Sequence, residues 1–272
     1  MTNPNEILPG VIFYSYLSAV RKEKACFLGN NKLVLQVSGQ FTFESSIQKI
    51  SMQTGEMLLI GKNQLGQLTK TPLPGEGYYE TIIICLQEEM LRKIALEEQI
   101  EVREKYTGPL NVHIPANDFL RGYFQSIIPY VRNPAERITP DMGILKVKEA
   151  VKLLLQAKPD LVKFLFDFSE PHKIDLEKFM LSNYHFNVTI EKFAELTARS
   201  LAGFKRDFQK TFGMSPRLWL QEKRLTEAQY LIAQKNMKPS AIYLDLGFES
   251  LSHFSHSFKK KFGKTPSEFC AP

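Results

Sequence analysis

Hydrophobic residues in the last third of the chain recur at the spacing of an α-helix. Leu201, Phe204 and Phe208 stand at positions i, i+3 and i+7. Phe212 continues this stripe, and Gly213 follows it directly. Side chains at this spacing lie on one face of a helix, and a glycine just past the last apolar residue is typical of a helix C-terminus. The pattern therefore predicts an amphipathic helix that ends at Phe212.

The same pattern returns 50 residues later in the chain. Residues 204–216 and 254–266 both read F-x3-F-x3-F-G-x2-P. A repeat of this length is typical of a duplicated supersecondary unit. Ser200 and Ser250 precede the two helices, and we expect their hydroxyls to cap the helix N-termini.

Neighbouring segments complete each copy as a helix-turn-helix unit. Short amphipathic stretches at 190–197 and 241–246 precede the two capped helices, with a tight turn between. Residues 217–235 connect the copies and are rich in helix formers. A helix of that length spans about 28 Å, and one turn of DNA is roughly 34 Å long. Such a connecting helix would let both second helices enter successive major grooves of one duplex.

The helix faces turned away from the aromatic stripes are small, polar and basic. Such side chains suit a helix in the major groove, because Arg pairs with guanine and Ala meets the thymine methyl group. The alternative is that both helices simply pack within an ordinary α domain. A merely solvated helix face would carry more carboxylates, however, and Asp207 is the only acidic residue of the two helices. The outer faces carry Ala202, Lys205, Arg206, Gln209 and Lys210, then Ser252, His253, Ser255, His256, Lys259 and Lys260.

Residues 174–272 resemble the DNA-binding domain of the AraC/XylS family of transcription regulators. Both copies of the aromatic motif carry this resemblance, and residues 247–269 follow the family signature almost throughout. In that family both recognition helices insert into the major groove. The resemblance implies base-facing positions at Ala202, Lys205, Arg206, Ser252, Ser255 and His256. It implies DNA-backbone contacts from Lys210, Thr211, Arg224, Lys259 and Lys260.

The N-terminal region has a different pattern. Short β-rich runs separated by turn residues predict a β-sandwich or a small barrel. These runs lie at 11–16, 33–37, 41–43, 57–60 and 78–86. Helical patterns follow at about 87–104, 117–131, 141–157 and 160–168. This order of elements resembles the cupin-like sensor domain, followed by dimerisation helices, of many AraC-type regulators.

We therefore expect an α+β chain with two domains. Residues 1–168 would form a cupin-like β-barrel or sandwich with dimerisation helices, which serves as the sensor. Residues 169–173 would be a linker, since Pro171 interrupts the helical patterns there. Residues 174–272 would form an all-α domain with two helix-turn-helix units joined by a long helix. Part of the helix at 141–157 would pair with a second subunit, since symmetric dimers are the commonest oligomers.

Aromatic residues of the β-rich runs have two interpretations. A small barrel can hold one small ligand, and these side chains would then line its pocket. The same side chains also fit a hydrophobic core, and this is the interpretation that we favour. The residues are Phe13, Tyr14, Tyr16, Phe41, Phe43, Tyr78 and Tyr79.

Composition and charge narrow the classes of protein. The 272 residues are 43% hydrophobic and 24% charged, which excludes a wholly disordered chain. The longest apolar run, residues 82–86, is far shorter than the roughly 20 residues of a membrane span. Three cysteines without a CxxC pair favour the reducing cytoplasm. Of the net charge of +6, residues 174–272 carry most, with 15 Lys and Arg against 10 Asp and Glu, as expected for binding to a polyanion.

Motifs for catalysis or metal binding are weak. Metal-binding cupins need clustered imidazoles, and His113 is the only histidine before residue 172. We therefore expect no metal, no cofactor and no catalytic residues.

The interpretation is a cytoplasmic, sequence-specific transcription regulator, an activator with an unidentified small-molecule or protein effector. Its expected partners are double-stranded DNA, RNA polymerase and a second copy of the chain, without membrane contact. The alternative is a β-barrel enzyme with an accessory helical module.

Overall fold

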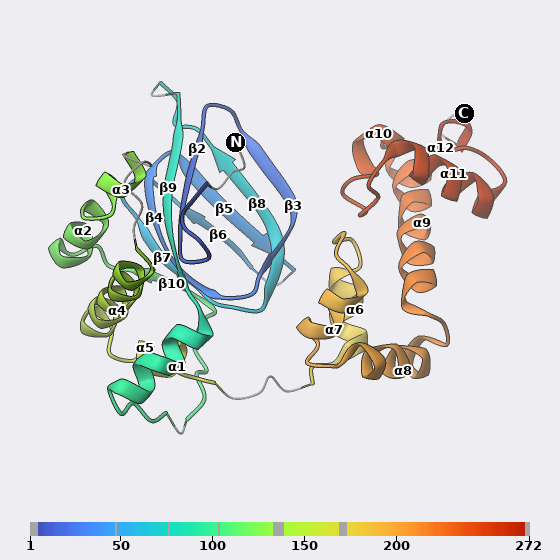
Figure 1. Ribbon diagram of the computed structural model, residues 1–272. Helices are drawn as coiled ribbons and strands as arrows, with labels where there is room; N and C mark the ends of the chain where they lie inside the picture. Colours follow the sequence, from blue (N-terminus) through green and yellow to red (C-terminus); the bar gives the residue numbers. More distant parts are fainter. Residues whose placement is uncertain are drawn as a thin grey trace. The chain divides into compact units, whose positions relative to one another are not determined.

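The computed structural model describes residues 5–46, 48–75, 77–102, 104–132, 139–168 and 173–269 (Figure 1). These residues form two compact units, an N-terminal unit of strands and helices and a C-terminal helical unit. The expected linker at 169–173 falls almost entirely outside the described residues. Within the described ranges, no helix combines the length and apolar character needed to cross a membrane.

The N-terminal unit contains two β-sheets that face each other. The larger has the strand order β1-β2-β9-β4-β7-β10, with antiparallel neighbours throughout. The smaller has the order β3-β8-β5-β6. Because the two sheets stay separate, the sandwich is confirmed and the closed barrel is wrong. The strands are β1 (Asn5–Leu8), β2 (Ile12–Leu17), β3 (Arg21–Leu28), β4 (Asn31–Ser38), β5 (Gln40–Ser45), β6 (Lys49–Met52), β7 (Met57–Ile60), β8 (Gln64–Thr71), β9 (Tyr79–Leu86) and β10 (Asn111–Ile114).

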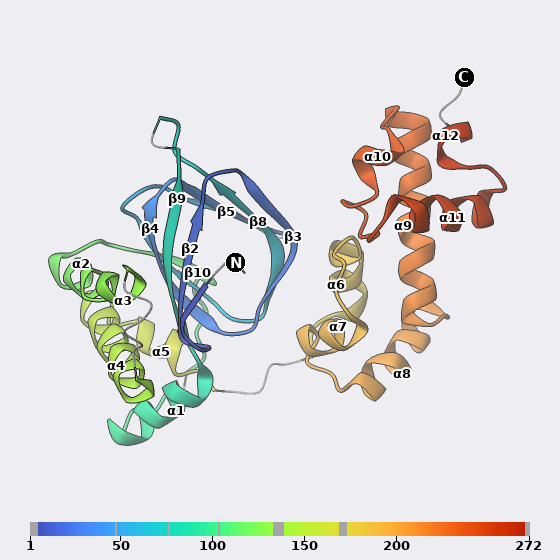
Figure 2. The same cartoon turned by 45° about the horizontal axis from the view of Figure 1, so that its top comes forward.

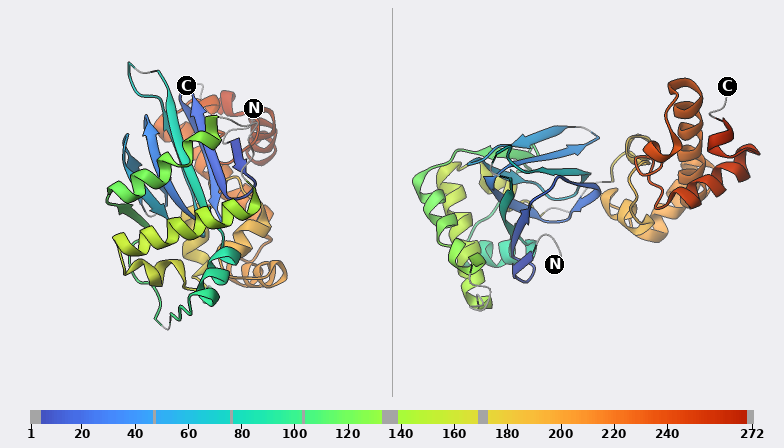
Figure 3. Two further views of the ribbon diagram at one scale, coloured as in Figure 1. Left: turned by 60° about the vertical axis from the view of Figure 1, so that its left-hand side comes forward. Right: turned by 90° about the horizontal axis from the view of Figure 1, so that it is seen from above.

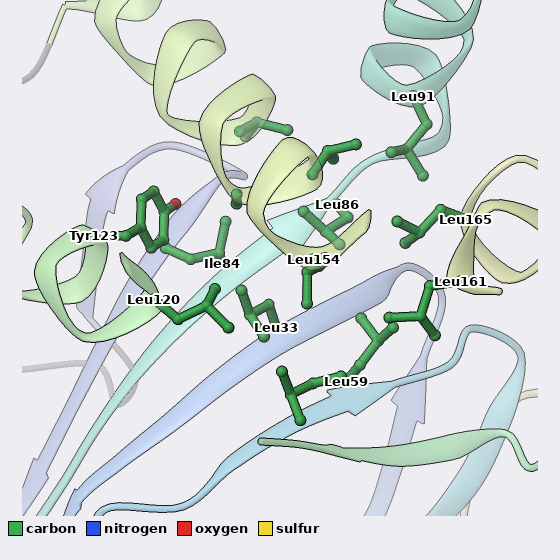
Figure 4. Close-up of a cluster of buried hydrophobic side chains, with 14 of the residues drawn as sticks. Leu33, Leu59, Ile84, Leu86, Leu91, Leu120, Tyr123, Leu154, Leu161 and Leu165 are labelled. Atoms are coloured by element: carbon green, nitrogen blue, oxygen red, sulfur yellow. The ribbon is translucent and has the colours of Figure 1, made fainter. Parts of the chain in front are cut away.

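Helices cover the outer face of the larger sheet (Figure 3). In the core between them, Leu33 and Leu59 of the strands lie close to Leu154 of α4 (Figure 4). The N-cap Thr139 and the proline at the first turn of α4 explain why this long helix begins where it does. The helices are α1 (Glu88–Glu97), α2 (Asp118–Gln125), α3 (Ile128–Arg132), α4 (Pro140–Ala157) and α5 (Leu161–Leu165). The helices predicted at 117–131, 141–157 and 160–168 are thus confirmed in outline, and the one at 87–104 is shorter than predicted.

The C-terminal unit is organised around one long helix, α9, with α8 near one end of it (Figure 2). The predicted connecting helix at 217–235 is confirmed as α9, and the predicted helix ending at Phe212 as α8. The segment predicted at 241–246 differs, because Pro239 starts a shorter helix there and residues 243–247 form a turn. The helices are α6 (Leu176–Asn183), α7 (Ile190–Leu196), α8 (Leu201–Phe212), α9 (Pro216–Lys235), α10 (Pro239–Ile242), α11 (Leu251–Phe262) and α12 (Pro266–Phe269).

Candidate nucleic-acid interface

The two helices of the repeat, α8 and α11, have matching ends. The Ser200 hydroxyl accepts a hydrogen bond of 3.1 Å from the amide of Gly203. The Ser250 hydroxyl accepts one of 3.2 Å from the amide of the third residue of α11. Gly213 and Gly263 follow the helices with φ of 69° and 76°, a conformation that glycine adopts without strain. The predicted caps are confirmed, so each helix presents a defined set of outward positions.

The aromatic stripes lie in the core in both copies. Phe204 and Phe208 of α8 are fully buried, as are Phe254 and Phe258 of α11. Trp219 of α9 packs edge-on against Phe208, with ring centroids 5.6 Å apart. Burial of these rings fixes the rotation of each helix, so the opposite, polar face of each points to solvent.

The proposed DNA-contacting residues occupy that solvent face. Because Ala202, Lys205, Arg206 and Lys210 recur at helical spacing, they share one exposed side of α8. Ser252 and His256 are exposed on α11, whereas Ser255 is half-buried. Thr211, Lys259 and Lys260 are also exposed. Among the described residues no carboxylate forms a salt bridge with Lys210, Lys259 or Lys260. Hydrogen bonds from Thr265 lower the pKa of the Glu268 carboxyl, and the charge of Lys259 lowers it further.

One basic residue outside the predicted set of DNA contacts extends this surface. Arg217, in the first turn of α9, is exposed and borders a groove of about 410 Å³ together with Lys205 and Gln209 of α8. Glu191 also lines this groove. Its own backbone amide and the Thr189 hydroxyl lower the pKa of the Glu191 carboxyl, and the charges of Lys205 and Arg217 lower it further. Only the folded structure identifies Arg217 as part of this basic surface, because nothing in the local sequence distinguishes it from other residues at the start of a helix.

Arg224 does not support its expected role as a DNA-backbone contact. Its Nε donates to the carbonyl of Tyr184 at 2.8 Å, and its two terminal nitrogens donate to the carbonyls of Phe186 at 2.8 Å and Gly247 at 2.9 Å. Burial lowers the pKa of this guanidinium to about 10, so it remains charged at neutral pH. We therefore correct the assignment, because each nitrogen of Arg224 is engaged within the fold.

The aromatic residues considered for a ligand pocket do not line one cavity. Alternation along β2 places Tyr14 and Tyr16 on the opposite face of the sheet from Phe13. Tyr14 donates to a carboxylate oxygen of Glu80 at 3.0 Å, and Tyr16, which is 52% exposed, stacks on Tyr78.

The remaining three candidates, Phe41 and Phe43 on β5 and Tyr79 on β9, are buried. Their burial agrees with the core interpretation, and the opposite faces of Phe13 and Tyr14 mean that the seven side chains do not all line one pocket.

Between the two sheets the interior also contains polar groups. Lys70 of β8 is almost completely buried and donates to the hydroxyl of Ser15 on β2 at 3.2 Å. The carboxylate of Glu23 on β3 lies 3.4 Å from the same ammonium group. The Thr81 hydroxyl donates to Gln36 at 2.7 Å. The hydrogen bonds of Ser15 and Thr81 give buried polar atoms partners, as a sandwich interior requires, whereas Glu23 Oε1 has the ion pair but no hydrogen bond among the described residues.

Comparisons with known proteins identify both parts of the chain. Residues 193–271 match the helix-turn-helix domain model, and residues 31–164 match the ExsA N-terminal regulatory domain model. The virulence regulon transcriptional activator VirF of Yersinia enterocolitica is 38% identical over 259 residues, which cover 87% of each chain. The chain belongs to the AraC/XylS family of transcription regulators.

Other known proteins align over parts of the chain or at lower identity. The regulator ExsA of Pseudomonas aeruginosa is 32% identical over 130 residues, 47% of each chain. The solved structure of apo ToxT from Vibrio cholerae is 14% identical, covers 96% of this chain and 97% of its own, and superposes with a TM-score of 0.43. Membership of the AraC/XylS family, shown by the sequence relatives, makes the protein a DNA-binding transcription regulator. Because its relatives are regulators, the enzyme alternative has no support from them.

Proposed function

We propose that α8 and α11 enter successive major grooves on one side of a DNA duplex, so that one chain reads two half-elements about ten base pairs apart. The observation that carries this proposal is the pair of capped helices with basic outer faces along one 20-residue connecting helix. Ala202, Lys205, Arg206, Ser252, Ser255 and His256 would face bases. Lys210, Thr211, Lys259 and Lys260 would contact phosphates and supply the salt-dependent part of the affinity.

The N-terminal domain, residues 1–168, would be the sensor and dimerisation domain, joined by the linker at 169–173 to the DNA reader at 174–272. Val147, Ala150 and Leu154 of α4 are buried toward the sheet, whereas Leu145 of the same helix is 59% exposed. This exposed side of α4 would pair with a second copy of the chain, giving a homodimer. A small molecule or a protein would act as effector at this domain.

The regulator would work in the cytoplasm as an activator that contacts RNA polymerase. A signal at the first domain would change how the two readers of a dimer are held, and so alter operator choice or polymerase contact. The activator names of relatives such as VirF support this direction of control.

Selection of duplexes from a random library by the full-length protein tests the proposal. We expect a recovered motif with two half-elements separated by about one helical turn. Repeating the selection with residues 1–168 deleted should recover the same half-elements, because only the second domain reads bases. Recovery of sequences without any shared motif at moderate salt would contradict the proposed reading of DNA.

A further inference from the structure

The two helix-turn-helix units touch along a narrow seam, formed by residues 184–187 before α7 and residues 247–249 before α11. At its centre, Gly247 has φ of 82°, and a Cβ atom there would lie 2.6 Å from the carbonyl oxygen of His185. The backbones of the two units are therefore in direct contact at this point, where only glycine fits. At the edge of the seam, the amide of Asn187 donates to the carboxylate of Glu249 at 3.4 Å.

Beyond the seam, the two units have their own cores. Trp219, in the first part of α9, packs against Phe208 and Phe212 of the first unit. Leu225, Ala228 and Ile232, further along α9, belong to a cluster with residues of the second unit. An open groove of about 720 Å³ runs beside the seam. The units are thus joined by α9 and the seam.

Arg224 lies where α9 passes from the first core to the second. Its guanidinium donates to the carbonyls of Tyr184 and Phe186 on one side of the seam and to that of Gly247 on the other. A guanidinium is planar and presents its donors in a fixed fork, so it can hold three carbonyls at set directions. The flexible ammonium group of a lysine cannot reproduce this arrangement.

We propose that Arg224 is a positioning residue that fixes the spacing and the rotation of α11 relative to α8. The inference rests on the proposed function, in which those two helices read half-elements in successive grooves. Each base pair between the half-elements turns the second groove by about a tenth of a turn. A reader whose units are clamped by Arg224 therefore tolerates one spacing and rejects its neighbours.

The expected effect of losing the clamp follows from effective concentration. Once the first helix is bound, the second finds its groove at a local concentration set by the stiffness of the connection. A looser seam lowers that local concentration at the correct spacing and raises it at wrong spacings. Binding of either unit to a single half-element does not depend on the clamp.

The test uses the full-length protein and the duplex that the wild type selects from a random library. Affinity is measured for that duplex, for duplexes with one half-element replaced, and for duplexes with one or two base pairs inserted between the half-elements. Arg224→Met removes the clamp, and Arg224→Lys keeps the charge without the fork. Lys235→Met is the matched control, because it removes a positive charge from the last turn of the same helix, away from the seam. Low salt makes binding to a single half-element measurable.

We expect both Arg224 variants to lose about tenfold or more on the intact duplex. Both variants should bind duplexes with a single half-element as tightly as the wild type does. Inserted base pairs should lower their affinity less than they lower that of the wild type. Lys235→Met should keep the wild-type spacing preference. If Arg224 only supported the fold, its replacement would lower the affinity for all duplexes equally, and that result would overturn the proposal. An unchanged spacing preference in Arg224→Lys would overturn it as well. If Arg224→Met does not fold, the folded Arg224→Lys protein decides the question. A wild type that selects single elements only would instead overturn the proposed function, and the inference with it.

Discussion

The guanidinium of Arg199 donates to a carboxylate oxygen of Asp207 at 3.0 Å. Asp207 is the only acidic residue on α8, and this ion pair neutralises it within the fold. Arg199 also donates to the carbonyls of Ile174 at 3.0 Å and Thr197 at 2.8 Å, so the pair ties the start of the domain to α8. The surface that faces DNA in our proposal is therefore more uniformly positive than the sequence of α8 suggests.

Replacing Asp207 by Asn should weaken this link without changing the bases that are read. The Arg199 hydrogen bond lowers the pKa of the Asp207 carboxyl, so its stabilising effect is present above the usual Asp pKa and is lost as the pH falls through the lowered value. We expect a small decrease in Tm for Asp207→Asn, followed by the fluorescence of Trp219, which is the only tryptophan. A changed sequence preference would place Asp207 against a base instead.

Arg206→Ala should cost roughly 1–3 kcal/mol of binding free energy and relax specificity at one base pair. The reason is that an exposed arginine in a recognition helix donates two hydrogen bonds to a guanine, which alanine cannot do. Affinities for all four bases at each position of the selected duplex provide the measurement. A loss of equal size for every sequence would identify Arg206 as a phosphate contact.

Lys260→Ala should weaken binding to all sequences to a similar degree. Removing one phosphate contact should also reduce the slope of log K against log salt by about 1. Lys178→Ala is the matched control, since Lys178 is exposed on α6, outside the two helix-turn-helix units. An unchanged slope for Lys260→Ala would remove this lysine from the backbone contacts.

Tyr123→Phe should stabilise the N-terminal domain. Its ring is buried, and among the described residues its hydroxyl finds no hydrogen-bond partner. Since a buried unsatisfied hydroxyl is destabilising, its removal should raise the free energy of unfolding by about 1 kcal/mol. Tyr79→Phe is the matched control, because the buried Tyr79 hydroxyl is hydrogen-bonded to the Thr81 hydroxyl at 2.8 Å and its loss should destabilise. Urea denaturation followed by circular dichroism distinguishes the two, and equal changes in both variants would contradict this account.

Mild acid should destabilise the C-terminal domain through His185. Burial lowers the pKa of this imidazole, the charge of Arg224 lowers it further, and Asp245 opposes them. Because the unfolded chain takes up the proton first, the free energy of unfolding should decrease as the pH falls below about 6.5, the ordinary histidine value. Denaturation at pH 7 and at about pH 5.5, followed by Trp219 fluorescence, measures this decrease. A His185→Gln variant should show a smaller decrease, and an equal one would exclude His185 as its source.

Sequence patterns predicted the recognition helices well, because apolar spacing and a terminal glycine are local signals. The strands β3 and β8 were missed for the opposite reason. Their polar residues, such as the buried Lys70, hide the alternation, and the contact of Lys70 with Ser15 joins residues 55 positions apart. A strand whose inward side chains are satisfied by distant polar partners cannot be identified from hydrophobicity alone.

The misassigned role of Arg224 has a similar origin. A basic residue on an amphipathic helix next to a recognition helix fits a phosphate contact as well as an internal clamp. Its acceptors are backbone carbonyls, which every residue carries, and the one at Tyr184 lies 40 positions away in the chain. Only the folded arrangement distinguishes the two roles.

The helix α9 gives part of its length to each of two cores, with Trp219 in one and Leu225 in the other. The duplicated motif therefore does not correspond to two independently folding modules, since a cut between the copies would leave one of them without the side chains that fill its interior. Unfolding of either unit would therefore leave apolar side chains of α9 exposed to water.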